Sequence, residues 1–289
     1  MTIAMAIVRD LFEGQVARTK ISYIAVTTMI VPMIAPKLGA ALLALGGWRI
    51  IHAVLAGIGV VLLLAMSLGF AESARIDAEN RLVPSVVARN YRRVLRHPVC
   101  LGYILVNAAS FGALFSYVSG SASFLISIVG LTPEQYGPVF AATSLGIMGG
   151  AFVNGRLSDW GVAPSYPLVI GLVLAAVSAA LLLAMALAGW MPLSLAVTLL
   201  ILGTLAFGLV APNALHEAMQ PMPQIAGATG AASGCIQMAV GAVSSGLVAI
   251  LYDGHSALSM TFVMFLCSLL AVVSYVMVAR AAEPAVSLS

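Results

Sequence analysis

The chain alternates between long apolar stretches and short polar ones, and one polar stretch is much longer than the others. Eight apolar stretches are long enough to cross the roughly 30 Å hydrocarbon core of a bilayer, which takes about 20 helical residues. They run from about 21–45, 50–70, 99–129, 136–153, 168–189, 193–215, 226–251 and 257–278. The first eight residues are apolar but too short to span, and we interpret them as the end of a further helix. The pattern predicts an all-helical membrane protein with eight full transmembrane helices and an N-terminal stub.

The long polar stretch, residues 71–98, carries six arginines and three acids. Within it, apolar residues recur near helical spacing and four arginines fall on the opposite face. The apolar set is Val83, Val86, Val87, Tyr91, Val94 and Leu95, and the basic set is Arg89, Arg92, Arg93 and Arg96. This pattern is typical of a basic amphipathic helix on a membrane surface. A solvated linker whose charges only mark the cytoplasmic side is the other interpretation. Either way, the stretch separates residues 1–70 from residues 99–289.

Composition agrees with a membrane protein and excludes several other classes. Hydrophobic residues make up 62% of the 289 and charged residues 8%, against roughly 25% charged in a soluble domain. The net charge of +3 is small and its arginines gather at loops, which argues against a nucleic-acid partner. Three distant cysteines without CxxC spacing predict neither a metal site nor disulfides. We find no catalytic or cofactor motif, so we expect neither an enzyme nor a cofactor.

The basic residues also predict the orientation of the chain in the membrane. If residues 71–98 are cytoplasmic, 11 of the 13 lysines and arginines lie on that side: three in the first turn, six in the long stretch, Arg156 and Arg280. Only Arg49 falls outside, and Lys37 lies within a span. Positive residues are enriched in cytoplasmic loops. We therefore expect a bacterial-type inner membrane, with the central loop and the C-terminus in the cytoplasm.

Several segments resemble one transporter family when taken together and in order. They are AIVRDLFEG from residue 6, VPMIAPKLGAALLALGGWR from 31, NYRRVLRHPVCLGY from 90, FSYVSGSASFL from 115, and AGATGAASGCIQMAVGAVSSGLVAILYDG from 226. These are similar to motifs of drug:proton antiporters of the major facilitator superfamily, in the bicyclomycin and chloramphenicol resistance branch (Bcr/CflA). The likeness covers almost the whole chain.

The resemblance implies a fold and a function. The fold is a helical bundle with two six-helix halves and the substrate between them. Residues 1–70 would hold the end of helix four and helices five and six, so the chain would be truncated at its N-terminus. The full-length parent would be a monomer in the lipid bilayer that exchanges protons for drugs or other small amphipathic compounds by alternating access. The alternative is a non-transporting remnant or a partner-dependent structural membrane protein.

For two motifs, this resemblance implies specific roles. Pro32, Pro36 and Gly39 form the fifth-helix motif, in which a bent, closely packed helix could rock between open states, although the prolines could equally mark only a kink. The cytoplasmic gate candidates are Arg9, Asp10, Gly155, Arg156 and Asp159. The second of these gate segments lacks the basic residues that the family has after the aspartate, and its glycine is one position early.

Lys37 is the one cation expected inside a span. It lies nine residues before Gly46, roughly 13 Å along the helix, near mid-membrane. A charge there costs about 2.5 to 3.5 kcal/mol on insertion scales. Contact with a substrate or counter-ion is one interpretation, and snorkelling to the interface is the other.

Other polar residues in the spans are candidates for the substrate pathway. They are Asn107, Ser110, Tyr117, Asn213 and Gln237. Hydrogen bonding between helices is the alternative role for each. All ten acids fall in loops or at helix ends, so the chain offers no proton site of its own. In the family the coupling acid would lie on the first helix.

Overall fold

The computed structural model describes residues 35, 38–39, 41–69 and 84–286, and within these ranges every regular element is a helix. Seven described helices are long and apolar enough to cross a membrane. They are α3 (Trp48–Gly69), α5 (Pro98–Ala122) with its π-helical continuation η2 (Ser123–Ile128), α6 (Pro133–Asp159), α7 (Ser165–Leu187), α8 (Leu193–Met219), α9 (Ala226–Ile250) and α10 (Leu258–Val286). The predicted all-helical membrane fold is confirmed. The span expected at 21–45 lies largely outside the described residues.

The helices α6, α8 and α10 end several residues later than the apolar pattern predicts. The sequence places residues 154–159 and 216–219 in connections, but they form the last turns of α6 and α8. Polar side chains are compatible with a helix that continues beyond the hydrocarbon core, where water and headgroups solvate them. The second gate segment therefore lies on a helix end and not in a loop.

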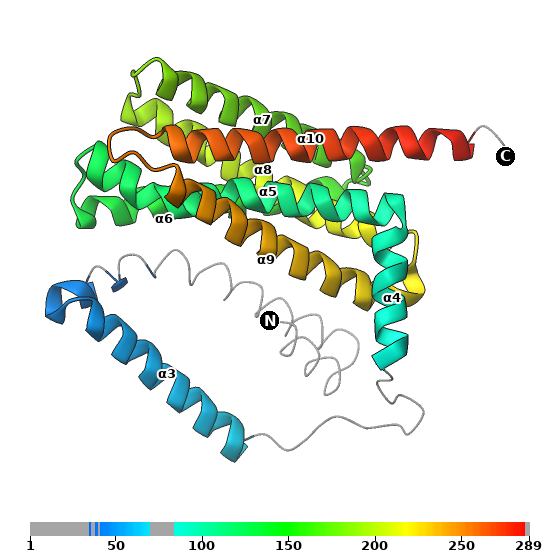
Figure 1. The fold of residues 1–289 in the computed structure, drawn as a ribbon, viewed down its shortest axis with the longest axis horizontal. Helices are drawn as coiled ribbons and strands as arrows, with labels where there is room; N and C mark the ends of the chain where they lie inside the picture. The colour runs from blue at the N-terminus through cyan, green and yellow to red at the C-terminus, as the bar shows by residue number, and fades with distance from the viewer. Residues whose placement is uncertain (1–34, 36–37, 40, 70–83, 287–289) are drawn as a thin grey trace. The chain divides into compact units, whose positions relative to one another are not determined.

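The described chain divides into two compact units. The smaller contains α3 and residues 133–141, and the larger contains residues 82–132 and 142–289. In the larger unit α5 lies at the centre and packs against α8, α9 and α10, while α7 packs against α8 and α10 (Figure 1). A core of seven side chains joins these helices: Val106, Ala109, Leu168, Leu172, Val210, Ala214 and Ala271. Small residues among them allow close helix packing, which drives association in lipid.

A short helix, α4 (Pro84–Arg96), precedes α5 and packs against α5 and α9. Figure 1 shows α4 running across the ends of these helices and not along them. Its apolar face is docked: Val94 is fully buried in a cluster with Cys100, Ile104, Ala218 and Ala232. The amphipathic pattern predicted this helix, but the sequence alone did not show that the bundle covers part of its apolar face.

The link from α4 to α5 is a single residue, His97. The His97 backbone N–H donates to the carbonyl oxygens of Arg93 and Val94, and its Nδ1 accepts from the Cys100 N–H at 3.3 Å. This cap, with Pro98 at the first helical position, starts α5 at a fixed angle to α4.

Helices α6 and α8 cross at glycines. A methyl group on Gly150 would overlap the Leu205 carbonyl oxygen and would lie 3.0 Å from the Gly208 Cα. A methyl group on Gly208 would in turn overlap the Ile147 carbonyl oxygen. The two backbones are therefore in direct contact, as in small-residue crossings of membrane helices.

We expect Gly150→Ala to lower the free energy of unfolding by about 1–3 kcal/mol, because the added methyl group meets rigid backbone. The neighbouring Gly149 is the matched control, since a methyl group there would meet nothing within 4 Å. Gly149→Ala should be neutral or stabilising by up to about 1 kcal/mol. Thermal unfolding of the detergent-purified proteins, followed by intrinsic fluorescence, measures both. Equal melting temperatures for the two variants would contradict the close crossing.

Candidate functional site

A hydrogen-bonded network joins α5, α6 and α8 in the bundle interior. The Tyr117 hydroxyl shares a 2.7 Å hydrogen bond with Thr143 Oγ1. Thr204 Oγ1 donates to the carbonyl oxygen of Thr143 at 2.7 Å and to that of Ile201 at 2.9 Å. Tyr117 is 2% exposed, so its ring is packed as well as bonded. The network ties three helices together at one level.

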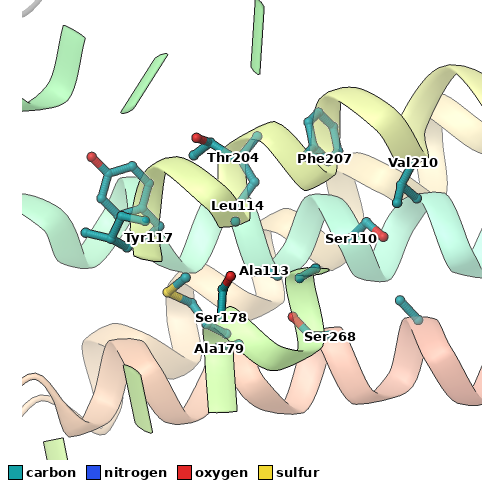
Figure 2. Close-up of a pocket in the computed structure, with 15 residues that line it drawn as sticks. Ser110, Ala113, Leu114, Tyr117, Ser178, Ala179, Thr204, Phe207, Val210 and Ser268 are labelled. Atoms are coloured by element: carbon teal, nitrogen blue, oxygen red, sulfur yellow. The ribbon is translucent and has the colours of Figure 1, made fainter. Parts of the chain in front are cut away.

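A small cavity lies beside this network, between α5, α7, α8 and α10. It measures about 30 Å³, room for about one water molecule. Figure 2 shows Ser110, Ser178 and Ser268 around it, with Tyr117, Thr204 and Phe207. The three serines are buried and come from three different helices. A cavity of this size excludes a drug-sized molecule.

Of the five pathway candidates that the structure describes, it brings two together at this cavity. Ser110 and Tyr117 line the same cavity. Asn107 lies apart and donates to Ser233 Oγ on α9 at 3.2 Å, and its buried Oδ1 has no hydrogen-bond partner. Gln237 is half-buried on α9.

Asn213 forms a cross-helix contact instead of joining that cavity. Its Nδ2 donates to Asn154 Oδ1 on α6 and to the Leu209 carbonyl oxygen, both at 2.6 Å. Asn107 and Asn213 thus both make the interhelical bonds that were the alternative to a substrate role. Their contact with a substrate stays a prediction.

A larger groove lies where α5 and η2 meet the end of α9 and the start of α10. Its volume is about 320 Å³, at the lower end of the range for small-molecule pockets. Six hydroxyl groups line it, from Ser119, Ser123, Ser245, Tyr252, Ser256 and Ser259, and none of its described lining residues is charged. Apolar walls come from Phe124, Ile128, Val248 and Met260. The Ser119 hydroxyl donates to Ser245 Oγ at 2.7 Å, which links α5 to α9.

We did not predict this groove from the sequence. The available signal is the run of serines at 116–123, together with Ser244 and Ser245 near the end of another span. Only the fold shows that these distant segments face each other. The π-helical turn of η2 widens α5 at this point, and such turns occur frequently at functional sites.

Asp253 holds the turn next to the groove. Hydrogen bonds from the Ser256 hydroxyl and from the backbone N–H groups of His255 and Ser256 lower the pKa of Asp253 to about 2. Because folding lowers this pKa, the ionised carboxylate stabilises the turn at pH values above 3.8, its ordinary pKa. The stabilisation is lost only as the pH falls towards about 2. The turn is therefore insensitive to the ionisation of Asp253 at physiological pH.

The predicted gate residues are only partly described. Gly155, Arg156 and Asp159 are exposed at the end of α6, and neither charge forms an ion pair with another described residue. Gly39 is described and has open space around it. Arg9, Asp10, Pro32, Pro36 and Lys37 lie outside the described residues. In the part of the chain that the structure describes, no three His, Cys, Asp or Glu side chains gather to hold a metal.

Comparison with known proteins points to one family. Residues 1–249 match the Major Facilitator Superfamily. A bicyclomycin resistance protein homolog of Haemophilus influenzae is 28% identical over 95% of this chain and 68% of that protein. An uncharacterized MFS-type transporter of Bacillus subtilis is 28% identical over 93% of this chain and 67% of its own length. The multidrug transporter MdfA of Yersinia pestis is 26% identical over 60% of this chain and 44% of its own.

A solved structure has the same fold. It is a bacterial homolog of the human lysosomal transporter Spinster in an inward-facing, unoccupied conformation. The TM-score is 0.55 at 12% identity, with 97% of this chain and 72% of that chain covered. At this identity the likeness concerns the fold alone.

Tyr117→Phe should lower the free energy of unfolding by about 0.6 kcal/mol, and by no more than about 1.7, because it removes one buried hydrogen bond between membrane helices. Tyr166→Phe is the matched control, since Tyr166 is 66% exposed. Reversible unfolding in mixed micelles with increasing denaturing detergent would measure both. A Tyr117→Phe protein as stable as Tyr166→Phe would show that the network contributes nothing.

Proposed function

The chain belongs to the Major Facilitator Superfamily of membrane transporters, and on this premise we propose that it exports drugs or other small amphipathic compounds in exchange for protons. Its relatives are consistent with the predicted Bcr/CflA branch. They include one protein named for bicyclomycin resistance and others named as multidrug transporters. Bicyclomycin is therefore the first substrate to test.

We infer the substrate class from the lining of the groove between α5 and α9. Six hydroxyls on apolar walls, without a charged side chain, suit a molecule with several polar groups and no obligatory charge. Hydroxyls both donate and accept, so they adapt to different hydrogen-bonding patterns. A site of this kind favours broad recognition over strict specificity.

The helix contacts support movement of the larger unit as one body. The glycine crossing of α6 and α8 and the Tyr117 network connect helices through short, direct contacts. Packed interiors of this kind resist continuous deformation. Alternating access in such transporters moves whole helix bundles around a central site, and we propose the same here.

Proton coupling needs a group that binds and releases protons within the membrane. All ten acids of the chain lie in predicted loops or helix ends, and none lines the groove or the small cavity. We therefore propose that none of these ten acids is the coupling group. Lys37 is the proposed contact for a substrate or counter-ion in the span.

The remaining proposals concern the orientation of the chain in the membrane and its oligomeric state. The central loop and the C-terminus lie in the cytoplasm, because this orientation collects the arginines on one side of an inner membrane. The functional unit is a monomer in the bilayer. The partner-dependent structural role is the competing function, and it predicts membrane insertion without substrate binding.

The groove is tested by replacing its two bonded serines together. Ser119→Ala/Ser245→Ala should weaken bicyclomycin binding to the purified protein about three- to thirty-fold, the loss of one or two modest hydrogen bonds. Thr198→Ala is the control, because Thr198 bonds only within its own helix, to the Ser194 carbonyl oxygen. Equilibrium binding with radiolabelled bicyclomycin gives both values. Equal binding by the two variants would remove the groove from the substrate pathway, and no binding by any form would favour the structural role.

Lys37→Ala should reduce transport in cells that express the complete transporter while leaving its abundance in the membrane unchanged. The physical reason is the loss of the cation that we propose as the contact for a substrate or counter-ion within the span. Lys37→Arg keeps the charge and should retain more activity. Resistance assays paired with quantitative immunoblots of membranes measure both effects, and unchanged resistance would identify Lys37 as a snorkelling residue.

A further inference from the structure

The exposed face of α4 carries the densest positive charge in the part of the chain that the structure describes. Arg89, Arg92, Arg93 and Arg96 follow the spacing i, i+3, i+4 and i+7, so they share one face of the helix. Together with His97 and Met222 they line a groove of about 460 Å³. Among the described residues, no carboxylate lines this groove and none forms an ion pair with any of the four arginines.

The position of this face is fixed by the docked side of the same helix. Val94 is fully buried in the bundle, so α4 cannot turn its arginines inward. Only His97 separates Arg96 from α5, a helix that is long and apolar enough to cross the membrane. The helix α4 runs across the ends of α5 and α9 (Figure 1), so we expect its arginines to lie near the level at which those helices leave the hydrocarbon.

Apolar side chains border the arginine face on both sides. Val86 and Leu95 are 38% and 44% exposed. A helix that presents arginines next to exposed aliphatic side chains suits an interface between headgroups and acyl chains. A dissolved anion would use the charges and leave the aliphatic side chains in water.

We propose that the arginine face of α4 is a binding site for anionic phospholipid headgroups. Arginine forms paired, charge-assisted hydrogen bonds with phosphate oxygens. Neighbouring arginines at i, i+3 and i, i+4 lie close enough to bracket one phosphate. Basic clusters on amphipathic helices next to a membrane span bind anionic lipids for the same reason. The site would anchor α4, and through Val94 the ends of α5 and α9, to the membrane surface.

The experiment measures binding of spin-labelled phosphatidylglycerol to the purified full chain in detergent, with spin-labelled phosphatidylcholine as the neutral reference. Each Arg→Gln substitution in the set Arg89, Arg92, Arg93 and Arg96 should weaken phosphatidylglycerol binding about five-fold. The four-fold Gln variant should lose the preference for phosphatidylglycerol, while the four-fold Lys variant should keep most of it. Arg49→Gln and Arg280→Gln are charge-matched controls from elsewhere in the chain and should have no effect.

Two further measurements distinguish a lipid-binding site from a site for other partners. Inorganic phosphate should not displace phosphatidylglycerol at ionic strengths matched with chloride, and displacement would mean a site for dissolved phosphate. Neutralising Glu72, Asp77 and Glu79 should leave lipid binding unchanged, and a marked increase would mean that these acids are the arginines' partners. Thermal unfolding confirms that each variant is folded. A folded four-fold Gln variant with an unchanged preference for phosphatidylglycerol would overturn the proposal.

Discussion

Polar groups inside a membrane must find partners within the protein, because the hydrocarbon core offers none. Among the described residues, cross-helix bonds from Tyr117 to Thr143, from Asn213 to Asn154 and from Asn107 to Ser233 meet most of this requirement, and Asn107 Oδ1 is the buried side-chain atom left without a partner. Close backbone contact between α6 and α8 at Gly150 and Gly208 brings the bonded side chains within reach. The arrangement of α5, α6, α8 and α9 depends on these pairings.

The same constraint helps to identify the candidate sites. Many hydroxyl groups line the groove around Ser119 and Ser245. A ligand or water in the groove can form hydrogen bonds with them, so they do not require partners on a packed helix. Where charge accumulates, as on α4, it lies beyond the spans with the apolar side of the helix docked. The proposed substrate groove and the proposed lipid-binding face thereby lie at opposite ends of α5.

The fold could be predicted from the sequence because a span of about 20 apolar residues is a local signal. The ends of α6 and α8 were missed because polar side chains do not stop a helix outside the hydrocarbon. Individual site residues such as Ser110 and Asn213 could be named, since a polar residue in an apolar helix is conspicuous. Their partners could not, because Asn154 and Asn213 meet only through the packing of two helices far apart in sequence. The groove was missed for the same reason, and Lys37 remains a prediction.

The activity that we propose is the exchange of protons for drugs or other small amphipathic compounds. Proton flux tests this activity: the purified protein is reconstituted in proteoliposomes with an interior pH indicator, and bicyclomycin is added outside in the absence of a pH gradient. Protons should leave the vesicles as bicyclomycin enters, so the interior pH should rise at a rate that saturates as the bicyclomycin concentration is raised. Bicyclomycin uptake without any change in interior pH would contradict proton exchange, and the absence of both would contradict transport of this compound.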